Sequence, residues 1–189
     1  IRQLLLAEET AVVPDGISVV KAMNLLGLPA KERITGVDLA DKLLRRAGEQ
    51  GKSVYLLGAK EEVVSALAQK LKAQYPQMEV RYKNGYSKDK DADFRDIEAF
   101  QPDLVLVALG VPAQEKLIAR HLGNFSKGVF IGVGGSFDVL SGSKRRAPAL
   151  FVKTNTEWLY RILREPSRLG RFYRNNIKFL GEVRKEAKD

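Results

Sequence analysis

The residues best suited to chemistry lie in a glycine-rich stretch, Gly132-Val-Gly-Gly-Ser-Phe-Asp138, which the basic run Lys144-Arg-Arg-Ala-Pro148 follows closely. Glycines have no Cβ, so their backbone amides can approach an anion within hydrogen-bonding distance. Ser136 is placed to cap a short helix whose positive end would face the same anion. The apolar run 129–131 before the glycines predicts a buried strand. We therefore predict a phosphate cradle at the carboxyl end of a sheet strand, formed by Gly132, Gly134, Gly135 and Ser136.

Two other interpretations of the glycine stretch are a dinucleotide fingerprint and a purely structural turn. The spacing is Gly-x-Gly-x-x-Phe, which lacks the third glycine of the Rossmann pattern, and no further strand follows to carry an acid for the ribose. NAD binding is therefore disfavoured, and a structural turn remains an alternative.

A carboxylate and an amide stand at two other turns that lead from a strand into a helix. Asp15, in the turn Pro14-Asp-Gly16, lies where open α/β sheets place their ligands, or it is a helix N-cap or turn residue. Gln114 follows the clearest buried strand, 103–109, and either hydrogen-bonds a ligand or caps its own backbone. Pro112 suits a first helical position. We count the turn residues Gly58, Gly110 and Pro112 among the candidate binding residues.

Four arginines near the C-terminus, Arg161, Arg164, Arg168 and Arg171, have helix-like spacing. Pro166 lies between them and breaks the run into two helices, so they do not form one straight face. They either clamp a phosphate, which a bidentate guanidinium does well, or form a solvated surface that leans on a membrane.

The composition contains few of the side chains that commonly bind transition-metal ions. The chain has no cysteine and one histidine, which excludes disulfides and thiol chemistry and disfavours a metal site built from those residues. Asp89-Lys-Asp-Ala-Asp93 has the Asp-x-Asp spacing of metal-dependent sugar transfer, but it follows a polar loop and opens a helix, whose dipole favours acids there. His121 is expected at the surface or at the end of a helix. We expect no metal and no cofactor.

The net charge of +9 is concentrated at the C-terminal end. Residues 139–189 contain 13 Lys and Arg against 5 Asp and Glu, whereas residues 1–138 contain 19 against 18. This asymmetry predicts an anionic partner: nucleic acid, a phosphorylated ligand or an anionic membrane surface. No apolar run is long enough to cross a bilayer and no signal peptide is visible, so we expect a cytosolic protein.

Strands alternate with helices along the first three quarters of the chain. This pattern predicts an α/β fold, a Rossmann-like and mostly parallel sheet with flanking helices. From residue 149 apolar stretches are threaded with arginine, which predicts a C-terminal helical basic appendage and two domains, 1–148 and 149–189. We expect strands at 12–13, 52–57, 78–82, 103–109 and 129–131, and helices ending near residue 9, over 17–26, 37–49 and 61–74, and ending at residues 100 and 121.

Six motifs occur in order along the chain: Val13-Pro-Asp-Gly-Ile-Ser-Val-Val20, Lys31-Glu-Arg-Ile-Thr-Gly36, Gly110-Val-Pro-Ala-Gln-Glu115, Gly132-Val-Gly-Gly-Ser-Phe-Asp-Val139, Lys144-Arg-Arg-Ala-Pro148 and Glu157-Trp-Leu-Tyr-Arg161. Together they resemble the WecG/TagA/CpsF glycosyltransferase family, and the resemblance extends from residue 12 to about residue 180. The tail from Trp158 through Lys178-Phe-Leu180 looks most like the TagA/TarA branch of wall teichoic acid synthesis.

The resemblance implies transfer of N-acetylmannosamine from UDP-N-acetylmannosamine to N-acetylglucosamine-diphospho-undecaprenol, without a metal and with inversion to a β-1,4 linkage. The partners would be a UDP-sugar donor, a polyprenyl-diphosphate-linked acceptor and an anionic membrane surface at the inner face of the plasma membrane. A homo-oligomer remains open. The alternatives are the uronic acid form of the sugar, another sugar of capsule synthesis, and a nucleic-acid-binding module; we expect no nucleic acid partner.

The resemblance also suggests roles for single residues. Asp15 matches the family's proposed general base, Arg33 and Gln114 match polar residues of its pocket, and Asp138 matches the acid that closes the glycine loop at the nucleotide. The family has an N-terminal portion with a Thr-x-Asn element that this sequence lacks, so we expect the site formed by these residues to be incomplete. Three arginines match basic residues of an appendage thought to fold over the pocket and contact the diphosphate: Arg161, Arg168 and Arg171.

Overall fold

The computed structural model describes residues 6–8 and 10–187, apart from the side chains of residues 161, 168, 171, 174, 175 and 186. The chain divides into two compact units. The sheet unit contains Gly36–Arg145 together with the first eleven residues. The helical unit contains Val12–Thr35 and Arg146–Asp189.

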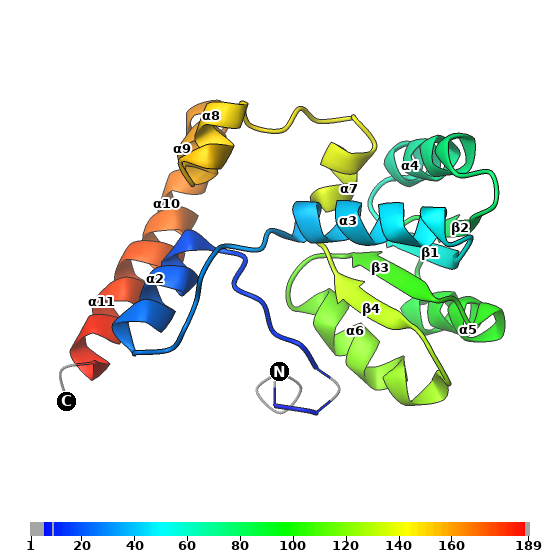
Figure 1. Ribbon diagram of the computed structural model, residues 1–189, viewed down its shortest axis with the longest axis horizontal. Helices are drawn as coiled ribbons and strands as arrows, with labels where there is room; N and C mark the ends of the chain where they lie inside the picture. The colour runs from blue at the N-terminus through cyan, green and yellow to red at the C-terminus, as the bar shows by residue number, and fades with distance from the viewer. Residues whose placement is uncertain (1–5, 9, 188–189) are drawn as a thin grey trace. The chain divides into compact units, whose positions relative to one another are not determined.

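The sheet unit is built on four parallel strands in the order β2-β1-β3-β4 (Figure 1). The register places Val54 of β1 opposite Leu104 of β3, and Leu106 of β3 opposite Ile131 of β4. Parallel neighbours need crossover connections, which the helices between the strands provide. The predicted parallel α/β fold is confirmed. The strands are β1 (Ser53–Gly58), β2 (Glu79–Lys83), β3 (Leu104–Ala108) and β4 (Val129–Gly132).

Helices cover both faces of this sheet (Figure 1). Successive side chains of a strand point to opposite faces, so the wholly apolar β3 has two faces to bury. One face packs against α3 (Gly36–Glu49), α4 (Glu61–Gln74) and α7 (Ser136–Leu140), and the other against α5 (Lys90–Phe100) and α6 (Ala113–His121), which a 3-10 turn, Leu122–Asn124, follows.

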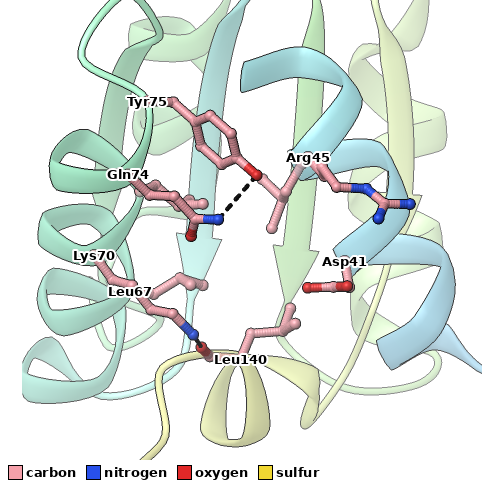
Figure 2. A pocket seen from close by; sticks show the side chains of 9 residues that line it. Asp41, Arg45, Leu67, Lys70, Gln74, Tyr75 and Leu140 are labelled. Atoms are coloured by element: carbon pink, nitrogen blue, oxygen red, sulfur yellow. Dashed lines mark hydrogen bonds between the residues drawn. The ribbon is translucent and has the colours of Figure 1, made fainter. Parts of the chain in front are cut away.

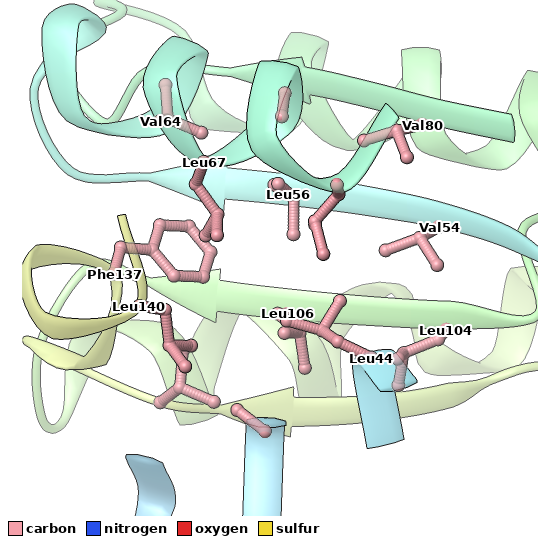
Figure 3. Packing of buried hydrophobic residues seen from close by; sticks show 14 of the residues in the cluster. Leu44, Val54, Leu56, Val64, Leu67, Val80, Leu104, Leu106, Phe137 and Leu140 are labelled. Atoms are coloured by element: carbon pink, nitrogen blue, oxygen red, sulfur yellow. The ribbon is translucent and has the colours of Figure 1, made fainter. Parts of the chain in front are cut away.

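Each face carries its own hydrophobic core. Leu56 and Leu106 lie on the first face, in one cluster with Phe137 of α7 (Figure 3). On the second face Val105 and Val107 pack with aromatic and aliphatic residues of α5 and α6. Burying one such side chain contributes about 1.5–3 kcal/mol, so the two cores hold the strand ends, and the loops that follow them, in fixed register.

Two expectations about single elements are wrong, and a third concerns residues mostly outside those described. Residues 12–13 form no strand. Strand β4 is not buried, because it is the edge strand of the described sheet, and Val129 is 53% exposed. The helix expected before residue 9 falls mostly outside the described residues, and residues 6–8 form a turn.

The helical unit joins α2 (Ile17–Leu25) to the C-terminal helices. Pro166 separates α9 from the next helical turn, as predicted. Trp158 stacks on Phe172 with ring centroids 4.3 Å apart, and the Ser18 hydroxyl donates to Asn176 Oδ1 at 2.7 Å. No helix among the described residues is both long and apolar enough to cross a membrane. The C-terminal elements are α8 (Ala149–Lys153), α9 (Glu157–Arg164), a 3-10 turn (Pro166–Arg168), α10 (Leu169–Phe172), a π-helical segment (Tyr173–Lys178) and α11 (Phe179–Glu186).

The compact units do not follow the boundary expected after residue 148. Val12–Thr35 belongs with Arg146–Asp189, because α2 packs against α11. The assignment of two domains, 1–148 and 149–189, stays a prediction.

Candidate active site

The candidate residues fall into two groups, one in each unit. The group in the sheet unit follows three neighbouring strands: Gly58 ends β1, Gly110 and Pro112 come after β3, and Gly132 ends β4. Parallel strands end at the same edge of a sheet, so the fold brings these turns to one edge, where open α/β sheets bind ligands. Pro112 is the N-cap of α6 and not its first residue, which corrects the sequence prediction by one position.

Gln114 connects two of these turns. Its side chain is 2% exposed, and its Oε1 accepts hydrogen bonds from the amides of Gly110 at 3.2 Å and Gly134 at 3.1 Å. Its Nε2 donates to Glu115 Oε1 at 2.8 Å. The side chain therefore caps the backbone of its own loop, one of the two roles expected for it, and also ties that loop to the glycine loop. Contact of Gln114 with a ligand stays a prediction.

The glycine loop offers fewer amides than the sequence suggested. Ser136 does not cap α7 with its side chain: α7 begins at Ser136, its N-cap is Gly135, and the Ser136 hydroxyl donates to the Val133 carbonyl at 2.7 Å. The amide of Ser136 donates to the same carbonyl, and that of Gly134 to Gln114. Within the described chain the amide of Gly135 has no such acceptor. A cradle here would therefore centre on Gly135.

Two glycines at this edge are required by close packing. A Cβ on Gly58 would lie 2.4 Å from the carbonyl oxygen of Ala108, and a Cβ on Gly132 would lie 2.5 Å from Gln114 Nε2. Gly135 differs, because the nearest atom to a Cβ there is Asp138 Oδ2 at 3.9 Å. The structural-turn interpretation thus accounts for part of the glycine pattern and leaves Gly135 open to a ligand.

The basic run begins beside the glycine loop. Lys144 Nζ lies 3.3 Å from Asp138 Oδ2, and the Lys144 amide donates to the Asp138 carbonyl at 2.7 Å. Asp138 is partly buried in the first turn of α7, and the neighbouring Arg145 is exposed. Asp138 therefore holds the start of the basic run next to α7.

The group in the helical unit begins with Asp15. Asp15 is exposed and directly precedes Gly16, which is the N-cap of α2, so the alternative of Asp15 as that N-cap is wrong. The carbonyl of Pro14 accepts a hydrogen bond from the amide of Ile34 at 2.9 Å. Two of the six motifs are thereby joined at the residue before the candidate base.

Arg33 forms a buried ion pair that sequence reasoning missed. Its guanidinium contacts the carboxylate of Glu157, and their side chains are 10% and 7% exposed. Arg146 Nε lies 3.6 Å from the other oxygen of Glu157. One signal could have indicated this role: Glu157 is the only acid between residues 139 and 164, in a segment rich in cations.

The structure places the backbone of the tail arginines but not all of their side chains. Arg161 lies in α9, Arg168 in the 3-10 turn and Arg171 in α10; their side chains lie outside the described residues. Arg164 is exposed, with its guanidinium carbon 5.9 Å from the centre of the Tyr160 ring. Contact of these arginines with a diphosphate stays a prediction.

A small pocket of about 100 Å³ lies elsewhere in the sheet unit (Figure 2). Its walls come from α3, α4 and the end of α7, with Asp41 and Arg45 on α3 and Lys70 on α4. Lys70 Nζ donates to the Leu140 carbonyl at 2.9 Å. None of the predicted site residues lines this pocket.

The acidic run at the start of α5 forms structural contacts. Asp89 caps the helix by accepting from the Ala92 amide at 2.9 Å, and the Lys83 ammonium lies 3.0 Å from buried Asp93. Among the described residues, no three His, Cys, Asp or Glu side chains are grouped as a metal site.

His121 ends α6, as expected, but is buried and not at the surface. Its ring nitrogens lie 2.8 Å from Glu98 and 2.7 Å from Asp91. Hydrogen bonds from His121 and Arg120 lower the pKa of Asp91, and bonds from Asn124 and His121 lower the pKa of Glu98. The histidine is thus part of a pairing between α5 and α6, separate from the candidate residues.

Comparison with known proteins identifies the class to which this fold and these motifs belong. Residues 2–189 match the model of the Glycosyl transferase WecG/TagA/CpsF family, and the chain belongs to that family. The resemblance inferred from the six motifs is therefore confirmed.

Three similar proteins share the name N-acetylglucosaminyldiphosphoundecaprenol N-acetyl-beta-D-mannosaminyltransferase. The protein of that name from Bacillus spizizenii is 39% identical over 170 residues, which is 89% of this chain and 66% of the relative. The one from Bacillus subtilis is 38% identical over 185 residues, covering 97% of this chain and 72% of the relative. The one from Staphylococcus aureus strain MW2 is 40% identical over 168 residues, covering 88% of this chain and 66% of the relative. The chain thus spans about two thirds of the length of these relatives.

Proposed function

We propose that this chain forms the catalytic part of an enzyme that transfers N-acetylmannosamine from UDP-N-acetylmannosamine to N-acetylglucosamine-diphospho-undecaprenol, as in synthesis of the wall teichoic acid linkage unit. The observation that carries the proposal is the 38–40% identity, over 88–97% of the chain, to relatives that bear this activity in their name. The exposed carboxylate of Asp15 and the turns gathered at the sheet edge supply groups that suit this chemistry.

Asp15 is the proposed general base. It accepts the proton of the acceptor's attacking hydroxyl as the new bond to the anomeric carbon forms, while the bond from that carbon to the UDP oxygen breaks and its electron pair leaves with UDP. A base on one side of the sugar and a leaving group on the other is what a single displacement with inversion requires. Exposure of Asp15 in the turn before α2 is consistent with access to a hydroxyl from solvent.

The charge that develops on UDP needs partners, and the proposal assigns this role to backbone amide and cationic groups. The Gly135 amide follows β4 at the sheet edge, Lys144 lies beside Asp138 of α7, and Arg161, Arg168 and Arg171 are the tail candidates. Loss of one such partner typically lowers the rate roughly 10²–10³-fold. Transfer without a divalent ion is part of this proposal, and activity retained in excess EDTA is its test.

The helical unit is proposed to contact the cytoplasmic membrane surface, where the lipid-linked acceptor resides. Several large apolar side chains are exposed on it, and lysines and arginines lie among them. Each cation near an anionic surface contributes about 1 kcal/mol of binding. The exposed apolar residues of the C-terminal helices include Leu150, Leu163, Leu169, Tyr173 and Ile177.

The decisive experiment incubates the full-length protein with UDP-N-acetylmannosamine or its uronic acid form and a short-chain lipid acceptor, and identifies the product by mass spectrometry. Transfer of N-acetylmannosamine supports the proposal, and transfer of the uronic acid alone would replace the donor. Asp15→Asn should abolish transfer while UDP binding persists, and Asp41→Asn on α3 is a matched control at another exposed carboxylate. Near-normal turnover of Asp15→Asn would remove Asp15 from the base role.

Removal of all residues after Pro148 tests the helical tail. We expect loss of transfer and weaker binding to vesicles that contain anionic lipid, because the cations and exposed apolar side chains are removed together. Full activity of the shortened protein would contradict the proposed contact between the tail arginines and the diphosphate.

A further inference from the structure

The helical unit contains a buried carboxylate, Glu157, for which the proposed chemistry has no direct use. Glu157 is the first residue of α9 and is 5% exposed. One carboxylate oxygen contacts Arg33, and the other lies 3.6 Å from Arg146 Nε. Two cations from different parts of the chain thus meet at one acid.

Local helix stability does not explain this burial. An acid in the first turn of a helix interacts favourably with the helix dipole even when it is exposed to solvent. Burial of an ion pair costs desolvation free energy that is often not recovered, so it is weak evidence of a stabilising role. What the pair does specify is geometry, because Arg33 and Glu157 are 124 residues apart in the sequence.

The ion pair between Arg33 and Glu157 is connected to Asp15, the candidate base, through one backbone hydrogen bond. Arg33 precedes Ile34, whose amide donates to the carbonyl of Pro14 at 2.9 Å, and Pro14 precedes Asp15. On the other side of Asp15, the Ser18 hydroxyl donates to Asn176 at 2.7 Å. The turn that carries Asp15 is therefore linked to the C-terminal helices on both sides. One link is the hydrogen bond between Ser18 and Asn176, and the other is the ion pair between Arg33 and Glu157.

We propose that Glu157 is a positioning residue for Asp15, acting through Arg33, so that the helix α9 sets the orientation of the base. The inference rests on the proposed function only for the role of Asp15 in transfer. Glu157 itself touches no substrate in this scheme.

The main test is Glu157→Gln in the full-length protein, which keeps the size of the side chain and removes its charge. We expect kcat to fall about 10–100-fold, because misplacement of a catalytic group by about 1 Å can cost that much. The dissociation constant of UDP should change less than about threefold, since Glu157 itself has no assigned contact with the nucleotide. Glu182→Gln, an exposed acid on α11, is the matched control and should keep the wild-type kcat.

A double-mutant cycle tests whether the effect passes through Arg33. Arg33→Gln combined with Glu157→Gln should have the kcat of Arg33→Gln alone, because residues in one contact act together. Additive losses would overturn the relay through Arg33. If Glu157→Gln does not fold, Glu157→Asp keeps the charge but shortens the reach, and an unchanged kcat in that variant would overturn the proposal.

Amide hydrogen exchange separates this inference from the proposed function. The amide of Ile34 should exchange faster in Glu157→Gln, whereas the amides of β1 and β3 should be unchanged. Faster exchange at Ile34 supports the positioning contact whether or not the enzyme turns over a candidate donor. Absence of turnover with every candidate donor would overturn the proposed function but not this inference. Unchanged exchange at Ile34, or a wild-type kcat in an active enzyme, would overturn the inference.

Discussion

Single alanine substitutions in the glycine loop distinguish glycines required for folding stability from a glycine required for UDP binding. The loop offers three positions in different surroundings. An added Cβ would meet the Gln114 side chain at Gly132, at 2.5 Å from Nε2 and 2.9 Å from Cδ. At Gly134 it would meet nothing within 4 Å, but φ is +50°. At Gly135 the nearest atom is 3.9 Å away and φ is −75°.

These surroundings predict three different costs in the free energy of unfolding. Gly132→Ala must displace buried Gln114, which breaks its bonds to the amides of Gly110 and Gly134. Two hydrogen bonds at about 0.5–1.5 kcal/mol each, with about 1–3 kcal/mol of overpacking, give a loss of about 2–6 kcal/mol. Gly134→Ala pays about 1–2 kcal/mol for a left-handed conformation. Gly135→Ala should stay within about 1 kcal/mol of wild type, since its conformation is accessible to alanine.

The assay combines urea unfolding followed by far-UV circular dichroism with calorimetric titration of UDP. Gly135→Ala should unfold like wild type yet bind UDP about tenfold more weakly, because a methyl group would obstruct the free amide. In a Gln114→Ala background, Gly132→Ala should cost less than about 1 kcal/mol, since the clash is gone. Unaltered stability of Gly132→Ala would refute the packing argument, and unaltered UDP affinity of Gly135→Ala would refute the amide contact.

Two further substitutions test the framework of the sheet unit. Gly58→Ala should cost about 3 kcal/mol or more, measured by urea unfolding, because φ is +125° and the Ala108 carbonyl blocks a Cβ; a stable variant would contradict this. Hydrogen bonds from the Ser53 amide and from Lys127 hold the pKa of Asp103 far below its usual range. A carboxyl with a lowered folded pKa contributes stability above its unfolded pKa of about 4, and that contribution is lost as the pH falls toward the folded value. Asp103→Asn should therefore be less stable than wild type at pH 7, with a difference that shrinks below about pH 4; a difference independent of pH would contradict the assignment.

Local signals predicted the elements of the sheet unit well. The helix expected over 61–74 is found as Glu61–Gln74, because a glycine turn precedes it and Pro76 follows it. The apolar run of β3 could be recognised as a buried strand because both of its faces are covered. The run of β4 is equally apolar but is not buried, because β4 lies at the edge of the described sheet. No local sequence pattern indicates that a strand will lie at an edge.

The candidate site was predictable as a set of residues but not as a set of contacts. The turns after β1, β3 and β4 meet because parallel strands share a carboxyl edge, which the alternation of elements already implied. The packing of two loops decides the contacts. Gln114 accepts a hydrogen bond from the Gly134 amide, and the Ser136 hydroxyl donates to the Val133 carbonyl and does not cap α7.

The amino-acid sequence by itself determined the order and lengths of most elements, the parallel α/β class and the family, because periodicity, turn residues and ordered motifs are local properties. Only the tertiary structure decided that Val12–Thr35 groups with the C-terminal helices, that Arg33 is paired with Glu157, and that Gly132 makes room for Gln114. Each of these depends on side chains distant in sequence that compete for the same space or charge. Such pairings are selected by packing and desolvation in the folded chain, and no local sequence pattern indicates which residues will meet.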